Sequence, residues 1–381
     1  MGGTWLPGIG FPLDLSELEG RRFDCLDDCQ LCCLCQPELL PQEEQFFRRN
    51  FPQRIVTRRT PHRHTALALK KGSGPCTFLD DRRCSVYPNR PHYCRQFPFH
   101  VHLMDRVQVS LDLSCRGVWA DSGEDATGIG LKLVSENERQ LQAGLEESRS
   151  VHRQFLANCR DAGIRVLPKD LRTRFEAVSR HAADLSFLGW MLDQSMEDEP
   201  LDLERHTSES SMDAAKSDEL RQAAMEVSLE SLSSEDPMSS PVYCDADGDW
   251  TVFISSDGEL DVYQLLEEGG MERKRGIDPK KVPLLAPEGM GAKLFVDYLN
   301  LLNSRDSVLG SAYYLLDEYG YDDELPNVYY GVLASSGLDL LWRSSLIAHL
   351  NGGVLDDNGV REGIIFYDMD RLDAPTIGAF M

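Results

Sequence analysis

The sequence FDCLDDCQLCCLC at residues 23–35 and the sequence CTFLDDRRCSVYPNRPHYCRQFPF at residues 76–99 decide how the first third of this chain folds. Of the eleven cysteines, nine lie between Cys25 and Cys115, and only Cys159 and Cys244 lie outside that interval. Short spacings between cysteines let one loop present two thiolates to one soft metal ion without strain. The clustering therefore predicts a metal site that organises a small, loop-rich unit.

Disulfide bonds and simple packing are the two alternatives to a metal site for the clustered cysteines. Disulfides belong to oxidising compartments, and the N-terminus lacks the basic start and apolar run of a secretory signal. No stretch approaches the roughly 18 consecutive apolar residues of a membrane span, so we expect a cytoplasmic protein with reduced thiols. Packing of free thiols is the interpretation that we favour for Cys159 and Cys244.

Eight cysteines form the predicted ligand set. They are Cys25, Cys29, Cys32, Cys33, Cys76, Cys84, Cys94 and Cys115. Neighbouring side chains diverge in most backbone conformations, so Cys32 and Cys33 rarely bind one tetrahedral ion together. Either two metal centres share this loop, or a polynuclear cluster is bound there, or one of the two thiols only packs.

The spacing also allows a second ligand pattern. Cys29, Cys32 and Cys35 form C-x2-C-x2-C followed by Pro37, as at the start of a bacterial ferredoxin cluster loop, which would need a remote fourth thiolate. Cys35 could thus replace Cys33 or Cys25 as a ligand. Zinc and an iron–sulfur cluster both fit these residues, and the density of thiols, with no histidine needed, slightly favours iron–sulfur.

The motifs F-x-C-x3-C-x2-C-C, C-x-F-L, C-x-V-Y and R-P-x-x-C-R-x-F-P resemble those of the YkgJ-like cysteine-cluster family. Members of that family are described as zinc- or iron-chelating, and the resemblance covers roughly residues 20–120. The family's usual first spacing is two residues, whereas three separate Cys25 and Cys29. Flagellin lysine N-methylases are more distantly similar, which implies protein methylation as an alternative activity.

Polar residues near the cysteines could support the site. Arg95, next to Cys94, could donate hydrogen bonds to a thiolate or a sulfide, although a surface ion pair is an equal alternative. Five histidines lie in the region, namely His62, His64, His92, His100 and His102. Each could bind a metal, but solvent or core roles are favoured for them. His100 and His102 are the best candidates of the five because they would project from the same face of one strand.

Charge is distributed unevenly along the chain, whose net charge is −24. Residues 1–120 carry a net +3 and residues 121–381 a net −27. This acidity makes nucleic-acid binding unexpected. The basic run at residues 48–71 could bind an acidic partner, a phosphate or RNA, but a solvated face that meets the acidic back half is favoured. We expect no membrane partner and leave an unknown protein partner open.

The predicted fold class is α+β. A cysteine-cluster metal-binding domain spans 1–120, a helix pair (134–163 and 168–194) packs on it over 121–195, a polar linker spans 196–240, and a mixed α+β domain spans 241–381. We expect strands at 97–104 and 107–113, a hairpin at 250–255 and 259–265, and a buried strand at 363–368 (GIIFYD). Helices are expected at 294–303, 307–319 and 338–350, together with a solvent-exposed helix within 212–232.

The remaining motifs limit the range of functions. No dinucleotide loop, P-loop, nucleophile elbow or zinc-protease motif occurs. Asp245-x-Asp247-x-Asp249 is better explained as a turn than as a calcium loop, and Asp368-x-Asp370 as a strand-end turn. We therefore predict a metal-binding protein, with zinc or iron–sulfur serving structure, electron transfer or metal handling. A lysine N-methylase-like enzyme and an interaction scaffold with structural zinc are the alternatives.

Overall fold

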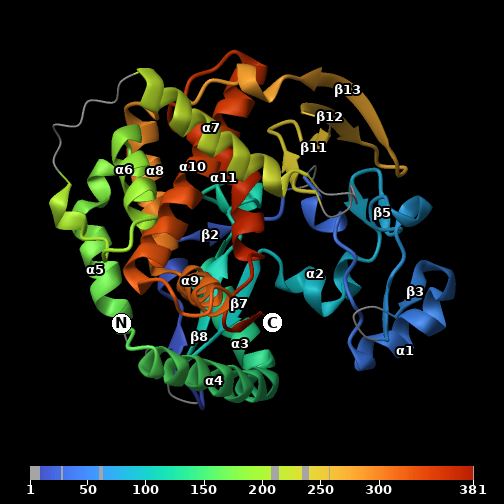
Figure 1. The fold of residues 1–381 in the computed structure, drawn as a ribbon. Coiled ribbons are helices and arrows are strands. Elements are labelled where there is room, and N and C mark those ends of the chain that lie inside the picture. Colours follow the sequence, from blue (N-terminus) through green and yellow to red (C-terminus); the bar gives the residue numbers. More distant parts are fainter. Residues whose placement is uncertain are drawn as a thin grey trace.

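The computed structural model describes residues 9–26, 29–59, 63–206, 214–233, 240–256 and 258–380. Within them the protein combines a loop-rich, cysteine-containing unit with a larger body of helices and sheets, drawn in Figure 1. The predicted α+β class is therefore confirmed.

The cysteine-containing unit is built from short elements. They are β2 (Arg22–Phe23), α1 (Pro41–Asn50), β3 (Ile55–Arg58), β4 (His64–Leu67), β5 (Leu79–Asp80), β6 (Arg83–Cys84) and α2 (His92–Gln96). A small apolar cluster around Phe47, Phe78 and Trp250 supports it. Because Trp250 lies far along the chain, the back half completes the core of this unit.

One four-stranded sheet joins distant parts of the chain in the order β1 (Leu13–Asp14), β8 (Val107–Leu111), β7 (Phe99–Leu103) and β14 (Ala379–Phe380). The expected strands at 97–104 and 107–113 are confirmed as the antiparallel pair β7–β8. All five residues of β8 are buried, which means that both faces of this strand are covered.

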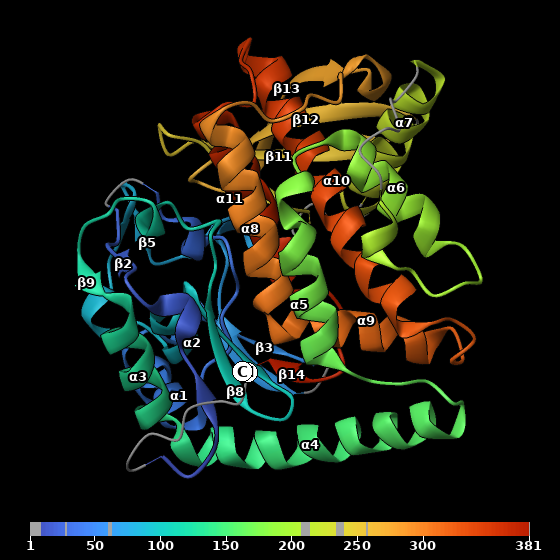
Figure 2. The same ribbon diagram turned by 90° about the vertical axis from the view of Figure 1, so that its left-hand side faces the viewer.

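Four helices, rather than two, occupy residues 121–195. They are α3 (Ala126–Glu136), α4 (Glu138–Asp161), α5 (Pro168–Val178) and α6 (Leu185–Ser195), and α3 follows the short strand β9 (Glu124–Asp125). Helix α4 contacts β7, and Figure 2 shows α4 along the lower edge of the molecule. Helices α5 and α6 instead contact helices of the back half, so the prediction that the second helix packs on the cysteine unit was wrong. Their buried residues, such as Phe175 and Phe187, explain this because they join the main hydrophobic core.

The main helical core surrounds one long helix, α10 (Leu325–Asn351). Its neighbours are α6, α7 (Ala214–Ser231), α9 (Asp306–Glu318) and α11 (Asp357–Leu372), while α8 (Met290–Ser304) lies against α11. The three predicted helices at 294–303, 307–319 and 338–350 are confirmed as parts of α8, α9 and α10. Because α10 is covered on several sides, it has no single apolar stripe, and its first half was missed.

The predicted strand at 363–368 was wrong, because these residues lie in the middle of α11. A short, continuously apolar run looks the same in a buried helix and in a buried strand. Gly363 shows why this helix fits here, since a Cβ at that position would lie 1.7 Å from the Ser344 hydroxyl on α10. The expected strand-end turn at Asp368 and Asp370 is consequently absent, and both carboxylates project from α11.

Helix α7 lies within the stretch predicted as a polar linker. Its residues Leu220, Ala224 and Met225 are buried, and the helix contacts α10. The expectation of a solvent-exposed helix was therefore wrong, because one face is covered. The division of the chain into four stretches remains a prediction, and one hydrophobic core extends from β7 and β8 to α10 and α11.

A second four-stranded sheet has the order β10 (Val242–Cys244), β11 (Trp250–Ser256), β12 (Glu259–Leu265) and β13 (Met271–Ile277). The predicted hairpin is confirmed as β11–β12, although Asp257 in its turn lies outside the described residues. The Asp245 carboxylate accepts hydrogen bonds from the backbone of Asp247 (3.0 Å) and Asp249 (2.8 Å), which confirms the turn.

One end of the basic run at residues 48–71 packs against the acidic back half of the chain. Lys70 lies 3.7 Å from Glu267, and the Lys71 ammonium donates a hydrogen bond to the Gly269 carbonyl oxygen over 2.8 Å.

Among the described residues, no helix has both the length and the apolar character needed to cross a membrane.

Candidate metal centre

Six cysteines line one small cavity of about 20 Å³, which we call the thiol cavity. They are Cys32, Cys33, Cys35, Cys76, Cys84 and Cys94. All eleven cysteines of the chain carry free thiols. Five of the eight predicted ligands are thus together, and Cys35, which the predicted set did not include, lies among them.

Local backbone structure brings the thiols together. Leu31–Cys33 forms a single 3-10 turn, entered through Gln30 in a left-handed conformation (φ 49°). This turn directs the adjacent Cys32 and Cys33 to the same cavity, although neighbouring side chains were expected to diverge. The amide of Cys76 donates to the Cys33 carbonyl oxygen over 2.8 Å, which fixes the second cysteine segment beside the first.

The donor chemistry of the thiol cavity suits a soft metal. No carboxylate or imidazole lines it among the described residues, whereas magnesium and calcium require oxygen ligands. Within the same residues, no group of three or more His, Cys, Asp or Glu side chains is arranged to hold a metal ion as it stands. The six thiols therefore surround the cavity without converging on one point, and binding would draw some of them inward.

Burial makes these thiols poor anions by themselves. Desolvation raises the pKa of Cys76 to about 11, and the neighbouring Cys84 and Cys32 contribute to the rise. Burial likewise raises the pKa of Cys94 and Cys84 above the usual value. A bound cation would reverse this effect, because a coordinating thiol is deprotonated outright. The residues present thus fit a thiolate-bound metal.

Arg90 is a further residue that could support a metal in the thiol cavity. Its guanidinium lies 3.7 Å from the centre of the Tyr87 ring, and both residues line the thiol cavity. The Arg90 Nε is buried without a hydrogen-bond partner among the described residues. A metal-bound thiolate would supply the missing acceptor and would gain a compensating positive charge.

Arg95, which the sequence offered for this role, does not line the cavity. It donates to the Arg90 carbonyl oxygen over 2.8 Å, and its guanidinium lies 3.5 Å from Glu43 with about half of the side chain exposed. Of the two interpretations, the surface ion pair is the one that the structure contains.

The other three predicted ligands lie elsewhere. Cys25, Cys29 and Cys115 do not line the thiol cavity. The sulfur of Cys29 lies 3.8 Å from that of Cys244, and this contact lowers the pKa of Cys29 to about 6. The Trp250 indole donates to the Cys29 carbonyl oxygen over 2.9 Å, so β11 fixes this segment.

A larger cavity of about 400 Å³, which we call the cleft, adjoins the thiol cavity. The two share Cys32, Cys35 and Cys94 as common walls. The last part of the chain contributes Met369, Asp373 and Phe380 to the lining of the cleft. Cys35 is exposed as a residue, whereas burial of its thiol raises the pKa to about 12.

His100 and Asp112 line the cleft as a charged pair. The His100 Nε2 lies 3.6 Å from Asp112 Oδ2. Burial alone lowers the pKa of His100, but the carboxylates of Asp112, Asp373 and Asp368 together raise it above the usual value. His102, on the same strand as His100, instead lies 3.2 Å from the Thr376 hydroxyl and lines neither cavity. His64 and His92 also lie away from both cavities, and His62 is outside the described residues.

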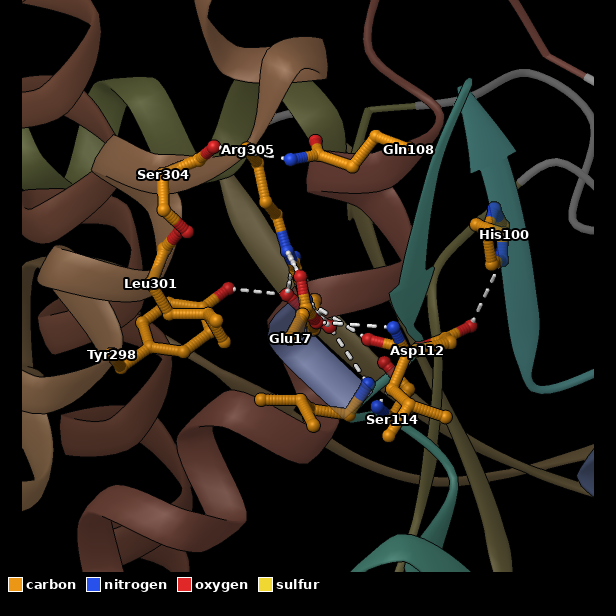
Figure 3. Close-up of polar contacts among 12 residues, drawn as sticks. Glu17, His100, Gln108, Asp112, Ser114, Tyr298, Leu301, Ser304 and Arg305 are labelled. Atoms are coloured by element: carbon orange, nitrogen blue, oxygen red, sulfur yellow. Dashed lines mark hydrogen bonds and ion pairs between the residues drawn. The ribbon is translucent and has the colours of Figure 1, made fainter. Parts of the chain in front are cut away.

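A buried ionic network fixes the chain around Asp112, as Figure 3 shows. Arg305, which is fully buried, pairs with Asp368 (2.6 Å) and Glu17 (2.8 Å). Asp368 also accepts a hydrogen bond from the Leu113 amide over 2.7 Å. The helical core thereby fixes the residues that follow β8, including one member of the His100–Asp112 pair.

The comparisons with known proteins concern only the cysteine-rich segment. No curated protein and no solved structure matches this chain. The YkgJ-like and lysine N-methylase resemblances remain predictions. Residues 24–116, under a third of the chain, match the CxxCxxCC family model, whose description is "Putative zinc- or iron-chelating domain".

Proposed function

We propose that the thiol cavity holds an iron–sulfur cluster, which exchanges electrons with a reactant bound in the cleft. The single observation behind this proposal is that six thiols line one cavity and that three of them also line the cleft. Iron–sulfur clusters are held by cysteine thiolates, and they supply one-electron chemistry when bound.

Two features favour a polynuclear centre over a single ion. Six thiols exceed the four that a tetrahedral ion takes, and the adjacent Cys32 and Cys33 both line the cavity. Arg90 offers an unpartnered buried donor, within the described part of the chain, to a negatively charged cluster. Hydrogen bonds to the sulfurs and solvent exposure both tune cluster potentials, so Arg90 and the exposed Cys35 would help to set this one.

Structural zinc is the second candidate, and the size of the thiol cavity favours it. A volume of about 20 Å³ accommodates little more than one water-sized object before the thiols rearrange. Four thiolates would then bind one zinc ion and leave two thiols free. The cleft would in that case have no redox partner.

Metal analysis of protein purified without oxygen separates the two candidates. We expect iron and acid-labile sulfide, with a broad visible absorption band that bleaches on reduction. Cys94→Ser should lose both the metal and the band, whereas Cys159→Ser is the matched control, because Cys159 is buried in α4 away from the cavity. Colourless protein with one or two zinc ions would establish the second candidate, and protein that takes up neither metal would refute both.

Access from the cleft needs its own measurement. In metal-free protein at alkaline pH, iodoacetamide should alkylate Cys35 faster than Cys115, as followed by mass spectrometry. Burial raises the pKa of both thiols, but Cys35 is an exposed residue and Cys115 a buried one. Loading with metal should protect Cys35. Equal labelling of Cys35 with and without metal would contradict a role for this thiol at the boundary between the two cavities.

A further inference from the structure

A cavity of about 620 Å³ lies among the helices, and the described residues that line it include no cysteine. Its walls come from α6, α7, α9, α10 and α11. A volume of this size is within the range of small-molecule sites. This helical cavity is therefore a candidate ligand site that is separate from the metal centre.

Two buried arginines line the helical cavity, and their hydrogen bonding differs. Arg343 is fully paired, since it contacts Asp339 (2.8 Å), Ser231 (2.6 Å) and the Phe366 carbonyl oxygen (3.0 Å). Arg371 donates only from Nη1, to the Ser311 hydroxyl over 3.2 Å. Its Nε and Nη2 are buried and have no hydrogen-bond partner among the residues that the structure describes.

An unpaired buried guanidinium is costly, so native structures supply a partner for it. Arg371 is 7% exposed, and burial lowers its pKa, as expected where no anion fully compensates the charge. The Nε and Nη2 donors point along the same edge of the planar guanidinium. That edge matches the two oxygens of a carboxylate in a bidentate pair.

The rest of the helical cavity limits what the carboxylate is attached to. Leu192, Val227, Leu315, Val328 and Val332 line it and offer an apolar surface. Asp339 and Asp370 also line the cavity, are already paired with Arg343, and disfavour a doubly charged anion such as phosphate. A ligand with one negative charge and an apolar chain fits both conditions.

We propose that this helical cavity binds a monocarboxylate with an apolar chain, whose carboxylate pairs with Arg371 and whose chain lies between α6 and α10. Within the described part of the chain, the helical cavity and the thiol cavity share no lining residue, so this proposal does not depend on which metal the protein binds. Arg371 is thus the binding residue of this proposal. Its Nε and Nη2 are closed to solvent in the ligand-free protein, so the side chain has to turn toward the cavity when the carboxylate pairs with them.

The test measures binding of sodium hexanoate to the purified full-length protein by calorimetry, beside 1-hexanol, hexylammonium and inorganic phosphate. We expect hexanoate to bind at least tenfold more tightly than the other three probes. Comparable binding of hexanoate and 1-hexanol would overturn the proposal, because the chain alone would then account for binding. Preferential binding of phosphate, or no binding of hexanoate, would also overturn it.

Substitutions test whether the ligand carboxylate pairs with Arg371. Arg371→Gln should weaken hexanoate binding at least tenfold and should not lower the melting temperature of the ligand-free protein, because it removes an uncompensated buried charge. Arg273→Gln is the matched control, since Arg273 is exposed on β13 and pairs with Asp261. If Arg371→Gln fails to fold, Val332→Trp tests the cavity instead by filling it from α10. Unchanged hexanoate affinity in either folded variant would refute the assignment.

Discussion

Replacing Asp368 with asparagine should reveal how much the buried ionic network contributes to stability. Asp368 is fully buried and accepts hydrogen bonds from Arg305 (2.6 Å), the Tyr298 hydroxyl (2.6 Å) and the Leu113 amide (2.7 Å). Asparagine preserves the volume of the side chain, but it removes the charge and turns one acceptor into a donor. The substitution therefore perturbs electrostatics without creating a cavity.

The expected cost follows from the partners that remain. Removing one member of a buried ion pair typically costs about 3–5 kcal/mol, because the other charge stays buried. Arg305 keeps Glu17 at 2.8 Å, so we expect the lower end, about 3 kcal/mol. In a chain of this length the loss corresponds to a melting temperature lower by on the order of 5 °C, which calorimetry resolves.

The same chemical change on the surface provides the control. Asp297 pairs with Lys293 over 2.7 Å on α8, and both side chains are more than half exposed. Exposed pairs contribute about 0–1 kcal/mol, so Asp297→Asn should melt within about 1 °C of the unmodified protein. If Asp368→Asn melts as high as Asp297→Asn, the network does not stabilise the fold, and the reasoning about Asp112 fails with it.

Two further substitutions probe the core by thermal and urea unfolding. Burial lowers the pKa of His102 to about 4 from 6.5, so protonation of the unfolded chain removes stability as pH falls from about 6.5 to 4. His102→Gln should abolish this loss, which amounts to about 2 kcal/mol at pH 5. Gly363→Ala should cost about 1–3 kcal/mol, because the new methyl group overlaps Ser344 on α10.

Controls for these two substitutions use exposed positions. His349→Gln, at an exposed site near the end of α10, should leave the acid-dependent loss in place. A pH profile for His102→Gln that parallels the unmodified protein would exclude His102 as its source. A methyl group at Gly163 would meet no described atom within 4 Å, but the φ of this residue is 82°, so alanine there tests backbone strain alone. Equal stability of the unmodified protein and Gly363→Ala would show that α10 and α11 separate at little cost.

The sequence was informative where local spacing carries the structure. The close cysteines, the strand pair around Asp105 and the hairpin after Trp250 could all be predicted because each depends on neighbours in the chain. The α10 helix was only half predicted, and the run at 363–368 was assigned to the wrong element. Both are buried on several sides, which removes the periodicity that distinguishes a helix from a strand.

The candidate site was less accessible to sequence reasoning because its walls are remote in the chain. Cys35 lines both cavities although the predicted ligand set omitted it, and nothing in the spacing decided between it and Cys33. The contact between Cys29 and Cys244 joins residues 215 positions apart. The cleft residue Asp373 could not be found either, since no local motif marks it.

In the proposed function, the back half of the chain would contribute residues to the cleft in which the reactant binds. The family match ends at residue 116, yet Met369, Asp373 and Phe380 line the cleft together with the three shared cysteines. Under the proposed function, the thiols would determine which metal binds, whereas the size and charge of these three residues would determine which molecule can enter the cleft. Two proteins with the same cysteine motif could then act on different reactants, and for this chain the selecting residues would lie in and just after α11 and in β14.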